Sequence, residues 1–221
     1  MSNKRTSLGK DVVCVLQSPV SSIKQKGNLT GNVRVLRDHI GDIYDLIQQW
    51  DKDLIEGVAV VSEIKRFMLN KIDAQKKNSP EFPHSNKLQV LSTDLDKICC
   101  RMKLLVEKLG QKSAFILTIL RLEDMQHKTT PVFLTWPISK FVQTSQNIYE
   151  MYRREMELKI SIKKEICFCA DKSTLAFYSI AWLQQPYIEK MVNLNYEAML
   201  KEAGYPSLYD KSTSKLNRIQ D

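Results

Sequence analysis

The feature that most constrains this chain is a heptad pattern of apolar residues between positions 33 and 72. Apolar side chains recur there at alternating spacings of three and four, which places them along one face of an α-helix. The a positions are Val33, Ile40, Ile47, Leu54, Val61 and Met68, and the d positions are Leu36, Ile43, Trp50, Gly57, Ile64 and Lys71. Burial of each aliphatic side chain contributes roughly 1.5–3 kcal/mol, so the remaining helices or another protein must cover this seam.

A second heptad pattern occupies positions 88 to 119, after a turn at residues 78–84. Its a and d residues are Leu88, Leu91, Leu95, Ile98, Met102, Leu105, Leu109, Lys112, Ile116 and Ile119. Ser85 is a suitable cap for this second helix, because its hydroxyl can accept a hydrogen bond from the first turn. The two patterns predict a coiled-coil-like helical hairpin over residues 31–126, although each helix could instead join a bundle with another helical protein.

The composition favours an all-α fold. Seven glycines and seven prolines in 221 residues are too few for a β-sandwich or barrel, which needs a turn about every 8–12 residues. Residues 127–204 predict three further helices, joined by elbows that contain proline and tryptophan. The expected architecture is therefore a long helical hairpin followed by a C-terminal helical region.

The three C-terminal helices have recognisable boundaries. The third is expected over residues 139–170, with apolar residues on one face and charged residues on the other. Asp171 is expected to cap the fourth helix, which should stop before a Gln-Pro pair because the residue before proline disfavours helical geometry. The fifth is expected to begin at Pro186 or Tyr187, since proline suits the first helical turn.

The net charge of +8 is unevenly distributed along the chain. Residues 1–30 carry +4 and residues 205–221 carry +1, which leaves +3 for the predicted folded part. The polar composition of the first segment predicts a disordered basic arm, and that of the last segment a flexible tail. Because the positive residues do not gather on a structured face, no specific nucleic-acid partner is expected.

No metal site, cofactor or membrane span is expected. Cys99 and Cys100, like Cys167 and Cys169, lie on helical patterns where neighbours point 100° or 200° apart, so they cannot share one tetrahedral metal ion. The apolar stretches are too short or too interrupted to cross a bilayer. Reduced cysteines of this kind are typical of a nuclear or cytosolic protein.

Catalytic activity is not expected either. The glycines stand singly, and none lies in the frame of a phosphate-binding loop. The carboxylates Glu155, Glu157 and Glu165 have no paired histidine pattern, so they are interpreted as surface ion pairs or caps. The sequence therefore predicts an interaction protein and not an enzyme.

The candidate site residues are apolar and aromatic. They are Ile47, Trp50, Leu54, Val61, Trp136, Trp182 and Tyr187. The first four lie on the first heptad seam, where a partner helix could pack. The last three lie beside prolines or proline-containing turns, where a large ring either anchors a partner or pins two helices together. Gly57, at a d position, either admits a bulky partner side chain or is a weak point of the helix.

Three motifs resemble the cyclin-dependent kinase 2-interacting protein family. They are Thr-Trp-Pro at residues 135–137, Glu-Met-Tyr-Arg at 150–153 and Trp-Leu-Gln-Gln-Pro-Tyr at 182–187. They occur in the order and at the spacing of that family, and the resemblance covers residues 131–204. In the first half, the helical pattern and Trp50 alone are similar.

The resemblance implies a non-enzymatic nuclear adaptor, with the cytoplasm as an additional location. The implied partners are a cyclin-dependent kinase, an origin-firing kinase, the ATR-interacting protein and the subunits of a chromatin-associated AAA+ ATPase complex. The implied roles are DNA replication and replisome upkeep, checkpoint signalling and maturation of the large ribosomal subunit. The alternative is a purely architectural coiled-coil subunit of another multiprotein complex, which the heptad patterns alone would equally suit.

Overall fold

The computed structural model of the chain describes residues 31–76, 85–125 and 132–205. These residues form five α-helices and no strand, so the predicted all-α class is confirmed. The helices are α1 (Asn32–Lys76), α2 (Ser85–Met125), α3 (Ile138–Glu165), α4 (Lys172–Gln184) and α5 (Lys190–Glu202). The predicted arm at residues 1–30 and the tail beyond residue 205 lie outside the described residues.

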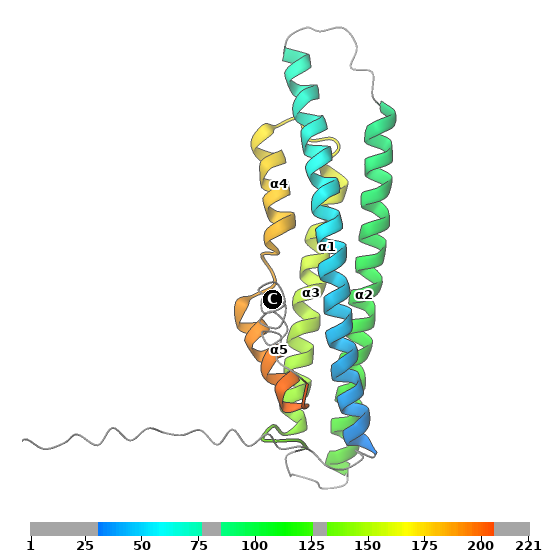
Figure 1. Cartoon of the computed structure of the whole chain (residues 1–221), viewed down its shortest axis with the longest axis vertical. Helices are drawn as coiled ribbons and strands as arrows, with labels where there is room; N and C mark the ends of the chain where they lie inside the picture. Colours follow the sequence, from blue (N-terminus) through cyan, green and yellow to red (C-terminus); the bar gives the residue numbers. More distant parts are fainter. Residues whose placement is uncertain (1–30, 77–84, 126–131, 206–221) are drawn as a thin grey trace, which may run out of the picture.

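The helices form an antiparallel bundle of four columns (Figure 1). The long helices α1, α2 and α3 run alternately in opposite directions, and α4 and α5 follow one another along the fourth column. α1 packs against α2, α2 packs against α3, and the α4–α5 column contacts both α3 and α1, which closes the ring. The arrangement resembles an up-down-up-down four-helix bundle whose fourth helix is broken in the middle.

Both heptad seams are buried in one core that draws on all five helices. The buried seam residues of α1 are Leu36, Ile40, Ile43, Ile47, Trp50, Leu54, Val61, Ile64 and Met68. Those of α2 are Leu95, Ile98, Met102, Leu105, Leu109, Ile116 and Ile119. The sequence left open whether other helices of the chain or another protein would cover these seams. The structure shows that helices of the chain itself cover them.

Ion pairs between α1 and α2 fix the register of the hairpin. Arg101 donates to Asp53 and Glu56, with nitrogen–oxygen distances of 2.9 and 2.5 Å. Lys112 donates to Asp42 at 2.7 Å. The step from Asp42 to Asp53 on one helix equals the step from Arg101 to Lys112 on the other, as antiparallel helices require. The pairs to Glu56 and Asp42 are partly exposed and contribute only about 0–1 kcal/mol each, so they specify alignment more than stability. Asp53 is buried, and Arg101 supplies its counter-charge.

Two helix boundaries differ from the sequence prediction. The third helix was expected over residues 139–170 but ends at Glu165, where a turn follows. The prediction that the fifth helix begins at Pro186 or Tyr187 is wrong, because α5 begins at Lys190. The physical reason is the turn at residues 185–188: the Ile188 amide donates to the Gln185 carbonyl, and Glu189 after it is extended (φ −73°, ψ 142°), so the helix begins only at Lys190.

Candidate partner-binding surface

The break between α4 and α5 is built around Gln185. Its φ of 48° lies in the left-handed region, and Pro186 after it disfavours continuation of the helix. The Ile188 amide donates to the Gln185 carbonyl at 2.9 Å, which closes a tight turn. The Gln185 side chain reaches back to α1, where its Oε1 accepts a hydrogen bond from Trp50 Nε1 at 2.6 Å. This contact ties the turn to the first heptad seam.

A buried ion pair on α3 supports both sides of the break. Glu155 and Lys159 have fully buried side chains, and Glu155 Oε1 lies 2.6 Å from Lys159 Nζ. The second carboxylate oxygen, Glu155 Oε2, accepts a hydrogen bond from the Tyr187 amide at 3.0 Å. Lys159 Nζ donates to the carbonyl of Trp182 and lies 3.4 Å from the carbonyl of Ala181. The cation thus binds the last turn of α4, where the helix dipole is negative.

Burial and the neighbouring carboxylate act in opposite directions on the pKa of Lys159. Burial lowers the pKa of the Lys159 ammonium, and the neighbouring Glu155 carboxylate opposes that shift by favouring the charged form. The interpretation of Glu155 as a surface ion pair is therefore wrong. A pair at spacing i, i+4 is also common on exposed helix faces, so the sequence did not distinguish the two cases.

Trp182 joins α4 to α1 through a notch at Gly57. A Cβ atom at Gly57 would lie 2.5 Å from Trp182 Cζ2, so only glycine admits the ring at this distance. Trp182 Nε1 also lies 3.5 Å from the Leu54 carbonyl oxygen. The bulky side chain predicted to approach Gly57 therefore belongs to this chain and not to a partner.

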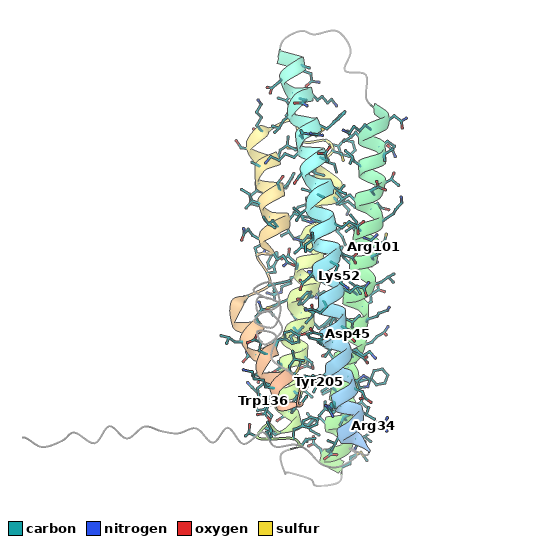
Figure 2. The ribbon with its side chains drawn as sticks, in the orientation of Figure 1. Arg34, Asp45, Lys52, Arg101, Trp136 and Tyr205 are labelled. Carbon is teal, nitrogen blue, oxygen red and sulfur yellow. The ribbon has the colours of Figure 1, made fainter. Side chains whose placement is uncertain are left out.

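A second joint connects α5 with the segment before α3. Glu202 accepts hydrogen bonds from the Thr135 amide at 2.9 Å, the Thr135 hydroxyl at 2.5 Å and the Trp136 amide at 3.2 Å. Tyr205 Oη donates to the Arg37 carbonyl at 3.0 Å, which attaches the end of this column to α1. Figure 2 labels Trp136 and Tyr205 at the same end of the bundle. The motifs at residues 135–137 and 182–187 thus mark the joints of the fourth column.

The structure separates the predicted site residues into core and surface. The side chains of Ile47, Trp50, Leu54, Val61 and Trp182 are buried in the chain's own core. Trp136 is half-buried beside Phe141, and Tyr187 is 46% exposed. Trp50 and Tyr187 converge on the α4–α5 break, whereas Trp136 lies at the other joint. Of the seven residues, Tyr187 offers the most accessible side chain.

Sequence reasoning missed the outer face of α4. Phe177, Ile180 and Leu183 are 60%, 59% and 52% exposed, although the opposite side of the same helix is buried through Leu175 and Trp182. The sequence did contain an indication, because residues 173–188 include no Asp, Glu, Lys or Arg, in a chain with 26% charged residues. A helix that is apolar on both sides has more apolar surface than the bundle covers.

Metal binding and membrane spanning find no support in the part of the chain that the structure describes. Its His, Cys, Asp and Glu side chains form no group of three or more that could hold a metal ion. Among the helices described, none combines the length and the apolar character that crossing a bilayer requires.

Curated relatives agree with the resemblance noted in the motifs. The chain is 28% identical to the cyclin-dependent kinase 2-interacting protein of Homo sapiens over 201 residues, which cover 83% of the chain and 95% of that protein. The Mus musculus protein of the same name gives the same identity and coverage. The Xenopus laevis protein of that name is 25% identical over 201 residues, 86% of the chain and 97% of that protein. No protein-family model matches the chain.

The similarity extends well beyond the motifs that first indicated it. Residues 131–204 alone could not account for 83% coverage, so the alignment also includes much of the helical hairpin. The region of similarity therefore contains most of the first heptad seam as well as the motifs at residues 135–137 and 150–153. Along most of its length, this helical chain is similar to the cyclin-dependent kinase 2-interacting proteins.

Proposed function

We propose that the chain is a non-enzymatic helical adaptor that binds a cyclin-dependent kinase in the nucleus. The observation that supports this most directly is the similarity, over 83% of the chain, to proteins named for their interaction with cyclin-dependent kinase 2. The bundle suits such a role because packed helices present a partner surface in a fixed geometry.

The adaptor also serves larger assemblies. On the resemblance of its motifs, its further partners are an origin-firing kinase, the ATR-interacting protein and the subunits of an AAA+ ATPase complex. The corresponding processes are DNA replication, checkpoint signalling and maturation of the large ribosomal subunit. In such a complex the ATPase subunits supply ATP hydrolysis, and this chain supplies contacts between proteins.

Kinase binding is tested with the purified full chain on a solid support and a cyclin-dependent kinase–cyclin complex in solution. We expect the kinase complex to be retained at physiological salt. The control is an unrelated helical bundle of the same net charge of +8, because a basic protein retains acidic proteins without specificity. Equal retention on both proteins, or none on either, would refute the proposal.

Membership of the ATPase complex is tested by mass spectrometry of the endogenous protein purified from nuclei. We expect AAA+ ATPase subunits in stoichiometric amounts, with ATP hydrolysis in the complex and none in the isolated chain. Recovery of a tethering or cytoskeletal complex instead would favour the architectural alternative. The same fractionation tests the nuclear location.

A further inference from the structure

The outer face of α4 differs from the other exposed apolar residues of the bundle. We name Phe177, Ile180 and Leu183 the α4 patch; their spacing of three places them along one side of the helix. On α2 the exposed residue Leu104 stands instead beside Lys103, which pairs with Glu107. Isolated exposed apolar residues are normal on soluble proteins, whereas a continuous uncharged face marks a contact surface.

The chain holds the α4 patch in a fixed position. Trp182 fills the notch at Gly57, Lys159 binds the last turn of α4, and Lys172 at its first turn donates to Asp73 of α1 at 2.6 Å. None of these contacts covers the α4 patch, whose three side chains are more than half exposed, and Figure 1 shows α4 at the edge of the bundle. A rigid apolar face loses little conformational entropy when a partner binds.

The chemistry of the α4 patch limits what can cover it. Residues 173–188 carry no charged side chain, so a charge on the partner's contact face would be buried without a counter-ion. The core of a protein interface is typically poor in charge and rich in aromatic and aliphatic side chains. The partner surface must therefore be apolar where it meets α4.

The size and charge of the surface argue against a second copy of this chain. With the exposed ring of Tyr187, the α4 patch presents roughly 400 Å². Any specific, stable interface needs about 800 Å² from each partner, so the α4 patch alone does not support a dimer of two rigid bundles, and two copies that each carry +8 also repel one another. A partner helix must likewise add contacts beyond the α4 patch. An area of this size matches the contact face of a single helix laid along α4. The side chains of that helix would pack between the α4 side chains at spacings of three and four.

We infer that the α4 patch docks the apolar face of an amphipathic helix from another protein. This helix packs alongside α4 and extends the bundle at its fourth column. The inference does not depend on kinase binding, since the partner is defined by its uncharged helical face and not by its activity.

The test places a photoreactive benzoylphenylalanine at position 180 of the full chain in cells. This side chain is apolar and replaces an exposed one, so the bundle should fold. After irradiation, mass spectrometry identifies the cross-linked peptides. We expect cross-links to apolar positions spaced three and four apart in a helix of another protein, and few from the matched control at Leu104, which is 56% exposed on α2. Cross-links to a second copy, to residues of the same chain, or no more than at the control would overturn the inference.

A charge substitution provides an independent measurement. Ile180→Glu should lower recovery of the cross-linked partner from a photoreactive residue at position 177 by at least about tenfold, whereas Leu104→Glu should change it less than about twofold. Thermal melts should show that both variants fold, since both side chains are exposed. Equal recovery with both variants would contradict the inference. If the cross-linked helix belongs to the kinase, the α4 patch is the surface that serves the proposed function. If the helix belongs to another protein, the α4 patch is a separate binding site. Either result supports docking of a helix on α4.

Discussion

At the scale of single residues, glycine positions in the bundle admit aromatic rings from other helices. Gly57→Ala would gain about 1 kcal/mol of helix propensity but would place a Cβ atom 2.5 Å from the buried Trp182 ring. Overpacking of this kind costs about 1–3 kcal/mol, so we expect a net loss of about 0–2 kcal/mol in the free energy of unfolding, measured by urea denaturation. The comparison is Gly41→Ala, where a Cβ atom would meet the hydroxyl end of the partly exposed Tyr205. Moving that end costs the hydrogen bond to the Arg37 carbonyl but displaces no buried ring, so the loss should be smaller than for Gly57→Ala.

The buried ion pair gives a second prediction at this scale. Lys159→Met would leave the Glu155 carboxylate buried with the Tyr187 amide as its partner, and stranding a buried charge costs about 3–5 kcal/mol. In the double variant Lys159→Met, Glu155→Gln the amide oxygen can still accept from Tyr187 without a charge. We therefore expect the double variant to be more stable than the single one in urea. The opposite order would show that the carboxylate is stabilised by groups other than Lys159.

At the scale of helices, Glu202 fastens the end of α5 to the segment before α3. Its carboxylate accepts three hydrogen bonds from Thr135 and Trp136. Glu202→Ala removes both acceptor oxygens and so all three hydrogen bonds, and because the site is partly exposed we expect a loss of about 1–2 kcal/mol by chemical denaturation. Glu202→Gln keeps one oxygen and should lose less. Faster hydrogen exchange of the α5 amides in the alanine variant would locate the effect.

The sequence predicted helices well where local residues determine them. Asp171 caps α4 as expected, because its side chain accepts from the Thr174 amide at 2.7 Å, three residues away. The start of α5 could not be read in this way, since the turn before it makes contacts with Trp50 of α1 and Glu155 of α3, which lie far away in the sequence. The candidate site contains the same two kinds of residue. Aromatic residues beside prolines were identified from the local sequence, but Lys159 was not, because its role depends on carbonyls of α4.

At the scale of the whole molecule, the heptad patterns predicted that two seams must be buried but not what would cover them. An a position requires an apolar neighbour and does not specify which chain supplies it. α1 and α2 cover each other in part, and the remaining cover is α3 and the broken α4–α5 column. The buried positions 138, 141, 145, 148, 152, 155, 159 and 162 of α3 also alternate at spacings of three and four, but polar residues occupy positions 145, 155 and 159, which hides the heptad pattern in the sequence. The break arises from Gln185 and its contact with Trp50, so it depends on residues 135 positions apart.

Because helices from both halves of the sequence share one core, a charge in the first seam should unfold the C-terminal helices as well. Leu54 is 8% exposed, and its carbonyl oxygen lies 3.5 Å from Trp182 Nε1. Leu54→Asp loses about 2–5 kcal/mol from the apolar side chain and adds a buried charge, which approaches the total stability of about 5–15 kcal/mol of a typical domain. We expect hydrogen-exchange protection to fall in α3, α4 and α5 together with α1 and α2.

The neighbouring residue provides the control for this last prediction. Ile55 is 70% exposed, so Ile55→Asp adds the same charge one position away without burying it and should leave protection unchanged in all five helices. If Leu54→Asp reduced protection in α1 and α2 alone, the C-terminal helices would fold without the seam. In that case, a charge at Ile47, Leu54 or Val61 that abolished binding of a partner protein would show that the partner contacts this seam. If all five helices lose protection together, the same loss of binding shows only that the bundle has unfolded.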